Sequence, residues 1–250
     1  MPLKNALQTL EIRGKNALRS LLVQGAIRAF RRAASRLDGI DSAVALAASF
    51  SYLRIQIAPA QVSSEITGLL KVLATRPPRT LLEIGAYKGG TFFLFSRVAA
   101  PDALLINLDL PATSWGQGTP AWRARLYNSF AREQQQIELV AEDSHQPATA
   151  ARIQTLLAGR ALDFLFIDGD HSYSGVKADY ELYSPFVAPG GLIALHDIVP
   201  ASTQLAFGVA QFWQELKKKE KGATSEFVAD WGQGGFGIGV VRVPVLNTHN

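Results

Sequence analysis

The chain has 250 residues, of which 48% are hydrophobic and 18% charged, and this balance excludes an intrinsically disordered protein. It has no cysteine, which excludes disulfide bonds and thiolate metal sites, and no apolar run is long enough to span a membrane. Residues 1–36 hold eight basic residues and one acidic residue, so the rest of the chain is slightly acidic and nucleic-acid binding is not expected. The N-terminus lacks the apolar core of a signal peptide, and we expect a soluble, cytoplasmic protein.

Three helices are predicted before residue 79. The first covers residues 16–36, with an apolar stripe on one side and most of its arginines elsewhere. That stripe favours packing on the main domain or on a second subunit, as in a homo-oligomer; the alternative is contact with an anionic membrane surface. The second helix covers residues 41–52. The third begins near Ser63–Ser64, with Glu65 favourable in its first turn, and ends at Pro77–Pro78.

From residue 79 onward, short apolar runs alternate with helical segments, and this order predicts a doubly wound α/β fold with a mostly parallel sheet. The apolar runs are "TLLEIG", "ALLINLDL", "IELVAED", "LDFLFIDGD" and "GLIALHD". The helices are expected near residues 90–100, 120–134, 146–158, 173–187 and 203–220. A closing pair of strands is expected at "EFVAD" and "FGIGVVRV". We divide the chain into a helical extension, residues 1–57, and a main domain, residues 58–250.

Each of the five apolar runs ends in acidic residues or glycine, and the carboxyl ends of parallel strands share one ligand-binding crevice. The first loop, "EIGAYKGGT", contains Glu83, Gly85, Gly89 and Thr91. It is neither a Walker A loop nor G-x-G-x-x-G, and Glu83 would repel a phosphate. A cofactor with a cationic amino-acid end, such as S-adenosylmethionine, fits better: Glu83 could hold its ammonium group, and Gly85 lets the backbone approach closely.

Two later strand ends fit the nucleoside part of the same cofactor. Asp109 could accept hydrogen bonds from both ribose hydroxyls, and Asp143 with Ser144 lies where the adenine edge would be. A strand-end aspartate is also a common helix N-cap, which is the structural alternative for Asp143.

From about Ala58 to Val243 the chain resembles class I S-adenosylmethionine-dependent methyltransferases. It is most similar to the cephalosporin-hydroxylase-like group and to metal-dependent sugar O-methyltransferases. The stretches that carry the resemblance are "LLEIGAYKGGT", "LDLP", "GQG", "EDSH", "LDFLFIDGDHSYSGVKADY", "PGGLIALHD" and "FGVAQFWQEL". The resemblance implies a Rossmann-like sheet of seven strands whose last strand is antiparallel. It leaves the acceptor open.

Asp168 and Asp197 end neighbouring strands, so their carboxylates are expected to lie close together. At such a short distance two carboxylates repel each other unless a proton or cation separates them. A divalent ion, Mg²⁺ or Mn²⁺, is the expected resolution; the alternative is that both residues are helix caps. In the resembling sugar methyltransferases an acidic pair follows the fifth strand, and the first member of that pair is His196 here. His196 is then either a third ligand, which would favour softer metals, or a support behind the ligands.

The resemblance also implies a general base at His171, three residues after Asp168. An alcohol attacks a methyl group only after losing its proton, which imidazole can accept near neutral pH. The alternative is that His171 hydrogen-bonds the turn before the next helix, with Asp170 orienting His171 or capping that helix.

The predicted function is metal-assisted O-methylation of a sugar or hydroxylated natural product. One alternative is a metal-dependent oxygenase with iron on His171, His196 and an aspartate; another is a cofactor-binding module without catalysis. A nicotinamide enzyme ranks last. Acceptor specificity is expected from residues 1–60, the loop 111–120 and the segment after Asp197.

Overall fold

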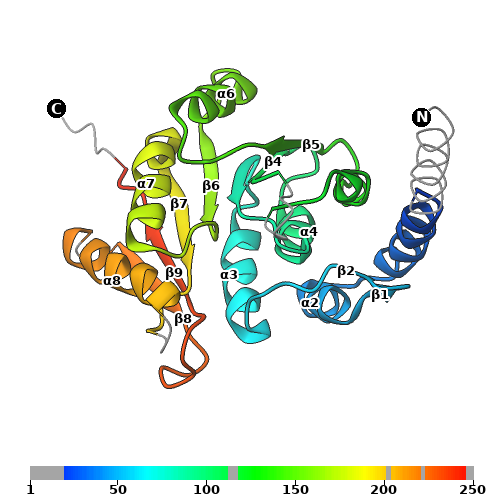
Figure 1. The fold of residues 1–250 in the computed structure, drawn as a ribbon, viewed down its shortest axis with the longest axis horizontal. Helices are drawn as coiled ribbons and strands as arrows, with labels where there is room; N and C mark the ends of the chain where they lie inside the picture. Colours follow the sequence, from blue (N-terminus) through cyan, green and yellow to red (C-terminus); the bar gives the residue numbers. More distant parts are fainter. Residues whose placement is uncertain (1–19, 112–117, 201–203, 221–222, 246–250) are drawn as a thin grey trace, which may run out of the picture.

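The computed structural model describes residues 20–111, 118–200, 204–220 and 223–245. Seven strands form one sheet in the order β5-β4-β3-β6-β7-β9-β8 (Figure 1). The first five pair in parallel, as the sequence predicts, and β9 is antiparallel to both of its neighbours, as the family resemblance implies. The strands are β3 (Thr80–Ile84), β4 (Leu104–Asp109), β5 (Gln136–Ala141), β6 (Leu162–Ile167), β7 (Val187–His196), β8 (Thr224–Phe227) and β9 (Ile238–Arg242).

Helices cover both faces of the sheet, so successive strand residues enter two separate cores. Phe164 and Phe166 of β6 belong to one core, while Leu165 and Ile167 belong to the other. The first core is closed by an N-terminal helix (20–34), α2 (Ile40–Ser49), α3 (Ser63–Thr75), α4 (Gly90–Val98) and α5 (Ala124–Asn128). The second is closed by α6 (Pro147–Leu157), α7 (Tyr173–Tyr183) and α8 (Gln204–Lys219). Two 3₁₀ turns, η1 (Ala121–Arg123) and η2 (Ser184–Phe186), adjoin α5 and α7.

The N-terminal helix packs on the main domain through its apolar side. Val23, Ala26 and Phe30 are buried in the first core. The Phe30 ring makes edge-to-face contacts with Phe50 and Phe93, at centroid distances of 5.2 and 4.8 Å. Helices 20–34 and α2 therefore share their core with the sheet, and the boundary at residue 57 stays a prediction. Among the described residues, no helix is both long and apolar enough to cross a bilayer.

Several predicted elements differ from the observed ones; β7 begins at Val187, four residues before the predicted strand, and α7 ends at Tyr183. The second helix ends at Ser49, and residues 51–56 form a hairpin of β1 (Ser51–Tyr52) and β2 (Ile55–Gln56). Its turn residues, Leu53 and Arg54, have positive φ without the glycine or asparagine that usually marks such a turn. The helix expected over 120–134 is only η1 and α5, and β8 begins at Thr224, two residues before the predicted strand. Residues 16–19 of the first predicted helix lie outside the described residues.

Candidate active site

A cavity of about 960 Å³ lies at the carboxyl ends of β3, β4, β5 and β6. Its walls come from the loops that follow these strands and from residues 118–123. The predicted site residues in the cavity wall are Gly85, Asp109, Asp143, Ser144, Asp168 and His171. Those outside the wall are Glu83, Gly89, Thr91, His196 and Asp197.

The first loop is shaped by glycine. Gly85 has a φ of +90°, and a Cβ there would lie 2.1 Å from the carbonyl oxygen of Asp168. Only glycine therefore lets the end of β3 cross so close to the end of β6. This crossing places the backbone of the first loop in the cavity wall, beside the proposed metal ligand.

Glu83 lies directly beneath this wall and is completely buried. Its Oε2 accepts a hydrogen bond from Asn107 Nδ2 at 2.7 Å, whereas Oε1 has no partner among the described residues. Burial, together with the charge of Asp168, raises the pKa of Glu83 well above its usual range. An unpartnered buried carboxylate oxygen is the kind of group that a cationic ligand would satisfy.

Asp109 lies in the cavity wall at the end of β4. Its Oδ1 accepts the Leu110 N–H at 2.9 Å, and its Oδ2 accepts the Thr119 hydroxyl. Burial raises the pKa of Asp109, although these two hydrogen bonds and one from the Ala86 backbone oppose the shift. Thr119 thus ties the far end of the loop after β4 to the strand end.

Asp143 serves a local structural role as well as facing the cavity. It accepts hydrogen bonds from the His145 N–H at 3.0 Å and from Gln146 Nε2 at 2.9 Å, just before α6. The Gln146 hydrogen bond, followed by that from His145, lowers the pKa of Asp143. The carbonyl of Ser144 accepts the Tyr183 hydroxyl at 2.8 Å. Asp143 therefore stabilises the turn before α6, but the N-cap of that helix is Gln146, so the helix-cap alternative for Asp143 is wrong.

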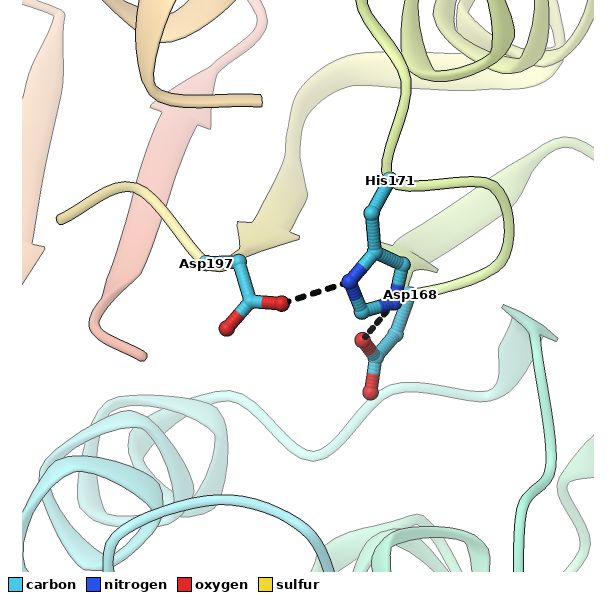
Figure 2. A group of neighbouring side chains, drawn as sticks. All are labelled: Asp168, His171 and Asp197. Atoms are coloured by element: carbon cyan, nitrogen blue, oxygen red, sulfur yellow. Dashed lines mark ion pairs between the residues drawn. The ribbon is translucent and has the colours of Figure 1, made fainter. Parts of the chain in front are cut away.

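Asp168, His171 and Asp197 converge at one edge of the cavity, as Figure 2 shows. One potential ligand atom from each lies within 4.8 Å of the others. His171 Nδ1 is 2.7 Å from Asp197 Oδ2, and His171 Nε2 is 3.6 Å from Asp168 Oδ1. The hydrogen bond to Asp197 raises the pKa of His171. The carboxylate oxygens suit Mg²⁺ or Mn²⁺, and an imidazole ligand would shift the preference towards softer metals.

His196 supports the same carboxylates from the buried side. Its Nδ1 lies 3.1 Å from Asp168 Oδ1 and 3.3 Å from Asp197 Oδ1. Burial alone would lower the pKa of His196, but the two aspartates raise it to about 9. Burial alone would raise the pKa of Asp197, but the His171 hydrogen bond and the His196 charge lower it. The imidazoles therefore compensate the paired carboxylates in this structure.

Several residues of this region were not predicted from the sequence. Gln61 Nε2 donates to Asp168 Oδ2 at 2.7 Å, and the Phe236 N–H donates to Asp197 Oδ1 at 3.0 Å. His145, Trp122 and Arg123 line the cavity. Gln61 and Phe236 stand in no recognisable motif. Trp122 and Arg123 lie in the 3₁₀ turn η1, within the stretch that the sequence predicts as one helix over 120–134.

Comparison with known proteins agrees with this arrangement. Residues 82–198 match a family described as a methyltransferase domain. An uncharacterized protein of Sinorhizobium fredii is 28% identical over 150 residues, which is 60% of this chain and 16% of that protein. An uncharacterized protein of Acanthamoeba polyphaga mimivirus is 31% identical over 118 residues, which is 47% of this chain and 51% of that protein. The matches thus span about half, or less, of the length of these curated relatives.

Solved structures share the fold at low sequence identity. An O-methyltransferase from Bacillus cereus in complex with S-adenosylhomocysteine has a TM-score of 0.57 at 17% identity, covering 88% of this chain and 100% of that one. The O-methyltransferase TomG from Streptomyces achromogenes, in complex with S-adenosylmethionine, has a TM-score of 0.55 at 16% identity, covering 84% and 92%. Residues 82–198 thus match a methyltransferase domain, and the chain shares the fold of these O-methyltransferase structures.

Proposed function

We propose that the chain transfers a methyl group from S-adenosylmethionine to a hydroxyl oxygen of a small molecule, a sugar or a hydroxylated natural product. The observation that carries the proposal is the cluster of Asp168, His171 and Asp197 at the edge of the cavity. A methyltransferase that acts on oxygen needs a way to take up the hydroxyl proton, and this cluster supplies acidic and imidazole groups for it. The solved structures named above are O-methyltransferases, which supports the same choice of acceptor atom.

The cavity offers groups for each part of the cofactor. Glu83, which is buried behind the wall, would hold the ammonium group through its free oxygen, directly or through water. Asp109 would accept the ribose hydroxyls, while Asp143 and Ser144 would lie beside adenine. Gly89 and Thr91 would act indirectly, by shaping the start of α4. These residues would fix the cofactor so that its methyl group faces the acceptor in line.

Asp168 and Asp197 would hold a divalent cation, Mg²⁺ or Mn²⁺, with His196 as the proposed third ligand or as the group that supports both carboxylates. Such an ion, when bound, makes a coordinated hydroxyl more acidic. His171 is the proposed base, and its hydrogen bond to Asp197 would stabilise the imidazolium once the proton has been taken up. The carboxylate oxygens of Asp168 and Asp197 favour a hard cation such as Mg²⁺, and a ligand from His196 would shift the preference towards Mn²⁺.

The test has a cofactor arm and a metal arm. S-adenosylhomocysteine should raise the melting temperature, since a ligand of the folded state stabilises it. With a panel of hydroxylated acceptors, EDTA should abolish methyl transfer and Mn²⁺ should restore it. Asp168→Asn should lose the response to Mn²⁺ yet keep the shift with S-adenosylhomocysteine, while His171→Gln should lower kcat far more than cofactor affinity. Asp102→Asn, an exposed change, is the control. Full activity in EDTA would refute the metal role, and absence of a thermal shift would refute the cofactor assignment.

A further inference from the structure

Asp168 is the end of a chain of buried hydrogen bonds that begins on α4. The Thr91 hydroxyl donates to Gln61 Oε1, and Gln61 Nε2 donates to Asp168 Oδ2 at 2.7 Å. Gln61 is 7% exposed and Thr91 is 6% exposed, so water does not compete freely for these bonds. A carboxylate only accepts hydrogen bonds, so Gln61 must present its NH₂ group to Asp168 and its oxygen to Thr91.

The backbone brings Gln61 into this position through a close approach to α4. A Cβ at Gly90 would lie 1.9 Å from the carbonyl oxygen of Ile57 and 2.4 Å from the nitrogen of Pro59. The absence of a side chain at Gly90 therefore allows the segment between β2 and α3 to rest on the first turn of α4. Thr91 is the next residue of that turn, which places its hydroxyl beside Gln61.

The chain of hydrogen bonds engages one oxygen of Asp168 and leaves the other facing the cluster. Oδ2 accepts from Gln61, while Oδ1 lies 3.1 Å from His196 Nδ1 and 3.6 Å from His171 Nε2. We propose that Gln61 and Thr91 are positioning residues for methyl transfer, which hold Asp168 so that its Oδ1 faces His171 and Asp197. This inference rests on the proposed function, and it assigns a role in the site to Gln61, which precedes the matched domain.

The experiment compares Gln61→Leu, Thr91→Val, Thr91→Ser and the double variant Gln61→Leu/Thr91→Val. Calorimetric titration with Mn²⁺ alone should show about 10- to 100-fold weaker binding for Gln61→Leu, the usual loss when a group that orients a metal ligand is removed. Thr91→Val should weaken binding in the same direction, and Thr91→Ser, which keeps the hydroxyl, should restore it. The double variant should bind no more weakly than Gln61→Leu, because both changes break one chain.

Gln135→Leu is the matched control. Gln135 is also a buried glutamine, 8% exposed, and its Nε2 donates to the carbonyls of Ser96 and Ala100. Gln135 directly precedes β5, so it lies at the end of the sheet opposite the cavity. It should lose stability without changing Mn²⁺ affinity. Unchanged affinity in Gln61→Leu, or additive losses in the double variant, would overturn the inference.

Crystal structures of the wild type and Gln61→Leu separate this inference from the metal proposal. A wild-type protein that binds no Mn²⁺ would refute the metal role alone. In that case the orientation of Asp168 decides: a carboxylate rotated away from His171 in Gln61→Leu supports positioning, and an unmoved carboxylate overturns it.

Discussion

Removing the carboxylate of Asp109 should weaken cofactor binding by an amount that follows from its hydrogen bonds. A carboxylate offers about four acceptor positions. The Thr119 hydroxyl and the backbone N–H groups of Leu110 and Ala86 use up to three of them, which leaves at least one for a ribose hydroxyl. Each hydrogen bond to a charged group contributes about 1.5–3 kcal/mol. We therefore expect a net loss near one such bond, about 10- to 150-fold in Kd.

Isothermal titration with S-adenosylhomocysteine measures this loss directly. Asp109→Asn should lie between wild type and Asp109→Ala, because the amide still accepts through one oxygen. Asp102→Ala, an exposed aspartate paired with Arg79, is the control and should bind as wild type does. A Kd for Asp109→Ala within twofold of wild type, in a protein that melts normally, would show that Asp109 does not meet the ribose.

Two further predictions concern stability. Phe30→Ala removes a ring that is 1% exposed and should lower the free energy of unfolding of the whole domain by about 3–5 kcal/mol in urea titrations; an unchanged transition would mean that residues 20–57 unfold independently. Asp179 is completely buried, and burial is the main reason that its pKa rises from 3.8 to about 6. The protonated carboxyl favours the folded state, so this contribution to stability is fully present below pH 3.8 and is lost as the pH rises through 6 and the group ionises. Between pH 4 and pH 7.5, the free energy of unfolding of Asp179→Asn should therefore rise relative to that of the wild type by up to about 3 kcal/mol. A difference between the two proteins that does not change with pH would contradict this.

The sheet and the strand-end acids were predictable because their signals are local. Each apolar run stops at a polar residue, and parallel strands bring those stopping points to one edge. Asp109, Asp143 and Asp168 could therefore be placed at the cavity from the sequence, and Asp197 beside it. The antiparallel last strand came from the family resemblance, and β9 confirms it.

The supports of the site were not predictable because their partners lie far away in the chain. Gln61 contacts Thr91 and Asp168, which are 30 and 107 positions further on, and no local pattern announces either contact. Glu65 was read only as a favourable charge in the first turn of α3, yet it is buried against residues 164 to 172 positions away. The hairpin after α2 was missed because Leu53 and Arg54 do not carry the usual turn signal.

The contacts of Glu65 also decide which positions near the site can change. Its carboxylate accepts the backbone N–H groups of Ala229 and Gly237 and the side chain of Gln233. Two of these three hydrogen bonds come from backbone N–H groups, so they persist when most side chains in this segment are substituted. Trp231 and Phe236, which are 52% and 40% exposed, contribute no side-chain bond to this anchor. A randomised library at these two positions would thus vary exposed side chains on a backbone that Glu65 anchors and that donates to Asp197 at Phe236, and so offers a starting point for evolving new acceptor preferences.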